Sequence, residues 1–145
     1  MIKLGLSTGL LLTALTACAS AAAQSDGTPH LENSGTLTHL MVDRKPFLIL
    51  GGELRNSSAS SLDYMKPIWS RMAAGNLNTL LAPVSWELTE PEEGKFDFSL
   101  VDGMIAAAQD NHLHLVFLWF GSWKNSGSFY APAWVRSDLK RFHRA

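Results

Sequence analysis

Cysteine is nearly absent from this chain, and so is any excess of charge. Cys18 is the only cysteine among 145 residues, so an internal disulfide is excluded. The formal net charge is −1, which gives no electrostatic reason to expect a nucleic acid or an anionic membrane surface as a partner. The five histidines are scattered along the sequence, which argues against a metal site. We therefore expect neither a metal ion nor another cofactor.

Several catalytic motifs are missing as well. The sequence has no Gly-x-Ser-x-Gly element, and Gly51-Gly52 lacks the Lys-Ser or Lys-Thr of a phosphate-binding loop. Hydrophobic residues make up 46% of the chain and charged residues 17%, which is ordinary for a globular protein. About 120 residues remain after the N-terminal segment, enough for one small domain but below the roughly 250 of a complete α/β barrel.

The first 23 residues have the composition of an export leader. Lys3 supplies the positive charge, and Leu4 to Ala17 is apolar but too short to span a membrane as a helix. Small residues at positions 19–23 offer cleavage points before Gln24. Cys18 ends a Leu-Thr-Ala-Cys sequence that resembles the lipoprotein box of bacteria. The mature protein is expected either as a soluble periplasmic form or as an outer-membrane lipoprotein lipidated on Cys18.

Short strands are expected next. Residues 24–35 are polar and predict a flexible segment. Apolar residues 36–42 and 47–50 flank an Asp-Arg-Lys turn, which predicts a β-hairpin. Gly51-Gly52 is expected to end the second strand, and the Ser- and Asn-rich residues 55–61 to form a loop.

Helices and strands then alternate. Apolar periodicity predicts helices over residues 62–74 and 100–111, and buried strands over residues 79–84 and 114–120. Ser61 and Ser99 are the expected N-caps of the two helices. The last strand is almost continuously apolar, as in parallel strands covered on both faces. This alternation predicts an α/β fold with right-handed βαβ units, which suits a doubly wound sheet or a barrel.

The most informative stretch runs from Asn78 to Phe98, with the sequence NTLLAPVSWELTEPEEGKFDF. A buried strand passes at once into Trp86, Glu87 and Glu90, and Pro91 then ends regular structure. Aromatic rings and carboxylates just past a strand end occupy the place where α/β barrels bind substrate. They suit a sugar, because its C–H face packs on Trp and its hydroxyls donate to carboxylates.

This stretch resembles the W-N/E-x-x-E-P-x-x-G-x-F-x-F signature of the β-galactosidase-like glycoside hydrolases, families 35 and 42. KPFLILGGELRNSSAS, residues 45–60, is similar to the first barrel strand and loop of the bacterial, xyloglucan-associated type of family 35. Residues 113–125, LHLVFLWFGSWKN, resemble the third barrel strand. Residues 130–135, YAPAWV, resemble the loop after it. The resemblance implies that residues 36–145 are a truncated barrel domain, the N-terminal portion of a (β/α)8 TIM barrel. This portion would hold about three βα units preceded by the hairpin.

The same resemblance implies where the chemistry lies. Retaining glycosidases use two carboxyl groups about 5 Å apart. In these families the acid/base glutamate follows an Asn at the end of the fourth strand, and the nucleophile ends the seventh. This sequence contains no Asn-Glu pair, so the catalytic residues are expected beyond Ala145. The chain alone is expected to be inactive.

Four residues are expected to contact substrate, namely Glu53, Trp86, Glu87 and Trp123. Each has a structural alternative. Glu53 would instead pair with Arg55, Trp86 would pack under its loop, and Glu87 would form a structural ion pair. Two neighbours are expected to be structural, with Glu90 fixing the loop and Trp119 in the core.

Two functions remain open on this basis. The first is the N-terminal part of an exported retaining β-galactosidase-like hydrolase that acts on galactose-containing plant oligosaccharides or polysaccharides. The second is a non-catalytic, surface-anchored carbohydrate-binding protein derived from such a barrel. The basic residues near the C-terminus, among them Arg136 and Arg141, are expected on a solvated face.

Overall fold

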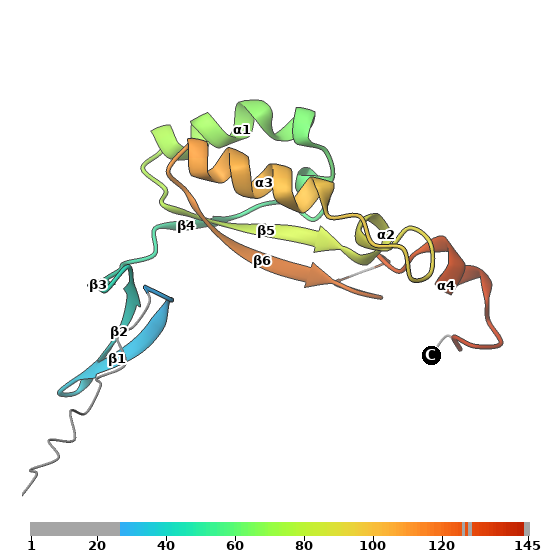
Figure 1. The fold of residues 1–145 in the computed structure, drawn as a ribbon, viewed down its shortest axis with the longest axis horizontal. Coiled ribbons are helices and arrows are strands. Elements are labelled where there is room, and N and C mark those ends of the chain that lie inside the picture. Colours follow the sequence, from blue (N-terminus) through green and yellow to red (C-terminus); the bar gives the residue numbers. More distant parts are fainter. Residues whose placement is uncertain (1–26, 126, 128, 144–145) are drawn as a thin grey trace, which may run out of the picture. The chain divides into compact units, whose positions relative to one another are not determined.

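The computed structural model describes residues 27–125, 127 and 129–143 (Figure 1). These residues fall into two compact units, one ending at Phe47 and the other beginning at Leu48. The expected leader, including Cys18, lies outside the described residues. No helix in the described part of the chain is long and apolar enough to cross a membrane.

The first unit contains a three-stranded antiparallel sheet in the order β1-β2-β3. Its strands are β1 (His30–Ser34), β2 (Leu37–Val42) and β3 (Lys45–Pro46). Asp43 and Arg44 form the turn between β2 and β3 with positive φ angles of 49° and 64°, as the right-handed twist of a tight hairpin requires. Part of the segment expected to be flexible is therefore a strand, and the hairpin strand expected over residues 47–50 is absent from the described chain.

The second unit contains a parallel sheet in the order β4-β5-β6. Its strands are β4 (Gly51–Glu53), β5 (Thr79–Ser85) and β6 (His114–Phe120). Two long helices, α1 (Leu62–Ala74) and α3 (Ser99–Asp110), lie on the same side of this sheet (Figure 1). The short helices are η1 (Ser58–Ser60), α2 (Trp86–Thr89) and α4 (Ala133–Ser137).

Strand β4 begins later than expected because the Asn78 side chain forms hydrogen bonds with the backbone just before it. The Asn78 side chain accepts a hydrogen bond from the Leu50 N–H (2.9 Å) and donates one to the Leu48 carbonyl (2.8 Å). The Asn78 N–H in turn donates to the Leu50 carbonyl (2.9 Å). Backbone pairing with β5 starts only at Gly51, opposite Thr79. Gly51 and Gly52 thus lie inside the strand that they were expected to end.

The predicted bounds of α1 are confirmed, and both long helices end in the same way. The Ser61 hydroxyl accepts the Tyr64 N–H (3.3 Å) at the start of α1, whereas α3 begins at Ser99 with the Asp97 carboxylate accepting the Ser99 N–H (2.9 Å). Ser99 is therefore the first helical residue and not the cap. At the C-terminal ends, Asn76 (φ 60°) and His112 (φ 55°) take the left-handed conformation that closes a Schellman motif.

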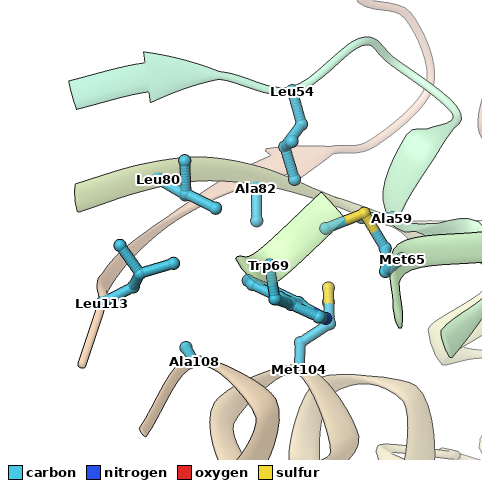
Figure 2. Packing of buried hydrophobic residues seen from close by; sticks show 9 residues of the cluster. All are labelled: Leu54, Ala59, Met65, Trp69, Leu80, Ala82, Met104, Ala108 and Leu113. Carbon is cyan, nitrogen blue, oxygen red and sulfur yellow. The ribbon is translucent and has the colours of Figure 1, made fainter. Parts of the chain in front are cut away.

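The core lies between the helices and the sheet (Figure 2). Figure 2 shows Trp69 of α1 and Met104 of α3 close together beneath Ala82 of β5. The buried cluster consists of Leu54, Ala59, Met65, Trp69, Leu80, Ala82, Met104, Ala108 and Leu113. Burial of these apolar groups is the main stabilising contribution to the second unit.

Strand β6 is less covered than its sequence predicts. Leu115 packs against the core cluster, but Val116 is 41% exposed, Phe117 39% and Trp119 58%. β6 pairs only with β5 among the described strands, so one of its edges is open. The expectation that Trp119 belongs to the core is wrong for this reason.

Candidate functional site

The expected site residues follow the C-terminal ends of neighbouring parallel strands. Glu53 is the last residue of β4, Trp86 follows β5 directly, and Trp123 lies just after β6. Ser85 pairs with Phe120 across β5 and β6, so these two strands end side by side. The parallel register therefore brings segments that are far apart in sequence to one edge of the sheet.

At this edge a pocket of about 810 Å³ contains both predicted tryptophans. Trp86 and Trp123 share it with Phe129, Phe142, Arg136 and His143. Trp123 and Phe129 are each 58% exposed, so a large part of each residue is accessible to solvent. An aromatic lining with a few polar groups suits a ligand that has an apolar face and hydroxyls at its rim.

The loop after β6 folds back onto α2. This contact brings Trp123 and Phe129 into the same pocket as Trp86. Trp123 and Phe129 form an isolated β-bridge, and the Tyr130 N–H donates to the Ser122 carbonyl (3.3 Å). The Tyr130 carbonyl then accepts the N–H of Glu87 (2.8 Å). The Tyr130 ring is buried against Phe120, with ring centroids 4.9 Å apart.

Glu90 fixes the orientation of Trp86. Its Oε2 accepts the indole N–H of Trp86 (2.7 Å), and its Oε1 accepts the backbone N–H of Gly94 (2.8 Å). The backbone carbonyl of Glu90 accepts the indole N–H of Trp134 (3.1 Å). The rings of Trp134 and Trp86 pack edge-on, with their centroids 5.7 Å apart. Each carboxylate oxygen thus already has a donor, as expected for a residue that holds the loop.

Glu87 pairs with Arg136, whose Nη2 lies 3.7 Å from its Oε2. Arg136 also lines the pocket and remains exposed, in agreement with the expected solvated position. Arg141 is also paired, through two hydrogen bonds of 2.6 and 3.1 Å to the Glu93 carboxylate. The hydrogen bond from Arg141 lowers the pKa of Glu93 and raises the pKa of Arg141 itself.

Glu53 lies apart from the aromatic lining. Its Oε1 is 3.7 Å from Lys124 Nζ, and Lys124 sits 4.8 Å from the centre of the Phe120 ring. The alternative in which Glu53 pairs with Arg55 does not occur in the described structure. Glu53 is instead linked to the loop that carries Trp123, while its role in substrate binding stays a prediction.

Sequence reasoning missed most of the pocket. Phe129, Phe142, Arg136 and His143 come from segments without a strand or a long helix, so no apolar period marks them. Within the described residues, no group of three or more His, Cys, Asp or Glu side chains is placed to hold a metal ion.

Comparisons with known proteins point in one direction. Residues 60–135, just over half of the chain, match the model of glycoside hydrolase family 42, described as β-galactosidase. The chain is similar to β-galactosidase of Xanthomonas manihotis, with 33% identity over 90 residues, or 62% of this chain. It is also 39% identical over 61 residues, 42% of this chain, to human β-galactosidase-1-like protein 2. It spans only 14% and 9% of the lengths of these two proteins.

A solved structure gives the same result for the fold. The exo-β-1,4-mannosidase Op5Man5 from Opitutaceae bacterium strain TAV5 superposes with a TM-score of 0.53 at 24% identity. The match covers 65% of this chain and 18% of the mannosidase. The α/β arrangement described above therefore fits the fold of a known glycoside hydrolase.

Proposed function

Because this chain belongs to the β-galactosidase family, we propose that it is the N-terminal part of an exported retaining glycoside hydrolase. The substrate class is galactose-containing plant oligosaccharides or polysaccharides. On this proposal the strands β4, β5 and β6 are the first three of a (β/α)8 barrel, and their C-terminal ends form one side of the sugar site.

The observation that carries the proposal is the aromatic pocket at the ends of β5 and β6. Trp86 and Trp123 come from different loops, yet both line this pocket. A galactoside has a C–H face that stacks on such rings, and its hydroxyls can hydrogen-bond to Ser122 and Arg136, which also line the pocket. Trp86 is pre-oriented by Glu90, so little conformational entropy is lost when a sugar binds to it.

The carboxylates of this chain are assigned to binding and positioning. Hydrolysis with retention needs one carboxyl group to protonate the leaving oxygen and a second, about 5 Å away, to attack the anomeric carbon. Both oxygens of Glu90 are occupied by N–H donors, and Glu53 and Glu87 face Lys124 and Arg136. We assign the reacting pair to strands outside residues 1–145.

The test begins with the DNA past codon 145. A reading frame that continues into an Asn-Glu before a strand end supports the hydrolase, and the complete protein should then cleave a nitrophenyl β-galactoside. The 145-residue chain should give no hydrolysis above background. Robust turnover by the short chain, lost on changing Glu53 or Glu87, would make those residues the catalytic pair and overturn the assignment.

A non-catalytic, surface-anchored carbohydrate-binding protein is the second candidate. The pre-oriented Trp86 supports it, since a binding protein needs the aromatic pocket without the reacting carboxylates. A true stop after codon 145, together with a soluble short protein that binds galactosides without cleaving them, would favour this candidate.

Both candidates include export to the periplasm or the outer membrane. Mass spectrometry of cell fractions distinguishes the two forms. A diacylglyceryl-Cys18 terminus indicates an anchored lipoprotein, and a start near Gln24 indicates a soluble one. An intact Met1 in the cytosol would contradict export.

A further inference from the structure

A second pocket, of about 550 Å³, lies in the segment that joins β4 to α1. Arg55, Asn56 and Tyr64 line it together with serines between positions 57 and 61. All seven lining residues carry a polar side-chain group, and Arg55 is the one full charge among them, whereas the pocket that holds Trp86 and Trp123 is lined mainly by aromatic and aliphatic side chains. A negatively charged group that hydrogen-bonds to the guanidinium therefore suits this pocket better than a neutral sugar face does.

The charge in this pocket is unbalanced. No carboxylate of residues 27–125, 127 and 129–143 forms an ion pair with Arg55. The acidic residues on either side of it in the sequence already have cations, because Glu53 pairs with Lys124 (3.7 Å) and Asp63 with Lys66 (2.6 Å). The guanidinium of Arg55 therefore presents one uncompensated positive charge to whatever enters.

The backbone around the pocket is held in place without a ligand. Leu54 is buried in the core, and its N–H donates to the Leu81 carbonyl (3.0 Å). The Ser58 N–H donates to the Arg55 carbonyl (2.9 Å), and the Ser60 hydroxyl donates to the Ser57 carbonyl (2.6 Å). These bonds fix a tight turn, so the pocket is preformed and binding needs little reordering of the chain.

One hydrogen bond connects this pocket to the candidate sugar site. The Asn56 side chain donates to the side-chain oxygen of Asn125 (2.9 Å), which lies two residues after Trp123. The loop after β4 and the loop after β6 are therefore joined directly.

We propose that the Arg55 pocket binds an oxyanion carried by a sugar, either the carboxylate of a uronic acid or a sulfate ester. The guanidinium supplies two parallel N–H donors to such a group, and Tyr64 supplies a ring and a hydroxyl beside it. This inference deepens the proposed function, on which it rests, because it makes the preferred substrate an acidic galactose-containing glycan. The acidic unit is a neighbour of the galactosyl unit and not the unit that is cleaved.

The test is calorimetric titration of the complete natural protein with D-glucuronate, D-glucose 6-sulfate and D-glucose. These gluco-configured probes avoid competition from the galactose site. One or both acidic sugars should bind, and glucose should not. Binding of glucuronate identifies the carboxylate as the ligand group, and binding of glucose 6-sulfate identifies the sulfate ester. Arg55→Gln should weaken the binding about ten- to hundredfold, since a charge-assisted bidentate contact is lost. Tyr64→Phe keeps the ring and should have a smaller effect.

Arg71→Gln is the matched control, because it makes the same charge change on an exposed residue of α1 that does not line the pocket, and it should leave binding unchanged. Equal binding of glucose and the acidic sugars, no binding of any probe, or equal losses in Arg55→Gln and Arg71→Gln would overturn the inference. Inorganic sulfate that binds as tightly as the sugars would also overturn it. A parallel assay with a neutral nitrophenyl β-galactoside separates the two hypotheses, since turnover there with no Arg55 effect leaves the hydrolase proposal intact.

Discussion

The exchange of Glu90 for glutamine tests how Trp86 is held. Both carboxylate oxygens of Glu90 accept hydrogen bonds, from the Trp86 indole at 2.7 Å and from the Gly94 backbone at 2.8 Å. A glutamine amide has only one acceptor oxygen, and its other end is an NH2 donor. Whichever way the amide is turned, Glu90→Gln sets its NH2 group against one of the two N–H groups.

The size of the effect follows from these contacts. A hydrogen bond to a charged acceptor contributes about 1.5–3 kcal/mol, and this one is only partly buried, so we expect a loss near the lower end of that range. The Gly94 amide should exchange with solvent about tenfold faster or more, since 1.4 kcal/mol corresponds to a factor of ten. Looser support of the Trp86 ring should raise the KM for a galactoside and leave kcat nearly unchanged.

The assay compares Glu90→Gln with Glu92→Gln in the complete natural protein. Glu92 lies in the same loop, and its side chain only pairs with exposed Lys95. The two variants have the same change in net charge, so a difference between them reports the hydrogen bonds. If Gly94 exchange and the KM respond equally in both, the positioning role of Glu90 is wrong.

Three further predictions follow from the same site and sheet. Trp86→Ala should weaken galactoside binding by about 1–3 kcal/mol, measured by calorimetry on the complete protein, and an unchanged affinity would remove Trp86 from the site. The 145-residue chain should not fold stably alone, because β6 has an open edge and exposed apolar side chains, so strong hydrogen-exchange protection across residues 115–120 in a monomer would contradict this. The ion pair between Arg141 and Glu93 should be intact at neutral pH and lost in acid. Because the pKa of Glu93 is lowered in the folded protein, the stabilisation from this ion pair is fully present above the ordinary pKa of 4.5. It disappears as the pH falls through the lower pKa of the folded state. Arg141→Gln should abolish this pH dependence in the exchange of the Phe142 amide, and an unaltered profile would show that another group causes it.

Much of the second unit could be predicted from local sequence. The bounds of α1 and β6 follow from apolar patterning, and a strand over most of β5 does so as well. The exposed state of β6 could not be predicted in the same way. Patterning reports how apolar a strand is, whereas its cover depends on which other elements lie beside it.

The errors occur where a side chain or a distant loop decides the structure. Residues 48–50 look like a strand but bond to the Asn78 side chain, and His30–Ser34 looks polar but pairs with β2. Trp86 and Trp123 could be found because they follow predicted strands. Phe142 and Arg136 could not, because only tertiary contacts such as the Glu87–Arg136 ion pair bring them to the pocket.

The Asn78 side chain has a consequence for protein engineering. It joins residues 48 and 50 to the start of β5 across about thirty positions of sequence, and so it sets the alignment of the first two parallel strands. An aspartate at this position would lack the N–H that reaches the Leu48 carbonyl. Recombination between related barrels must therefore transfer residues 48–50 and Asn78 together. A crossover between them would separate the partners of the hydrogen bonds that align the two strands.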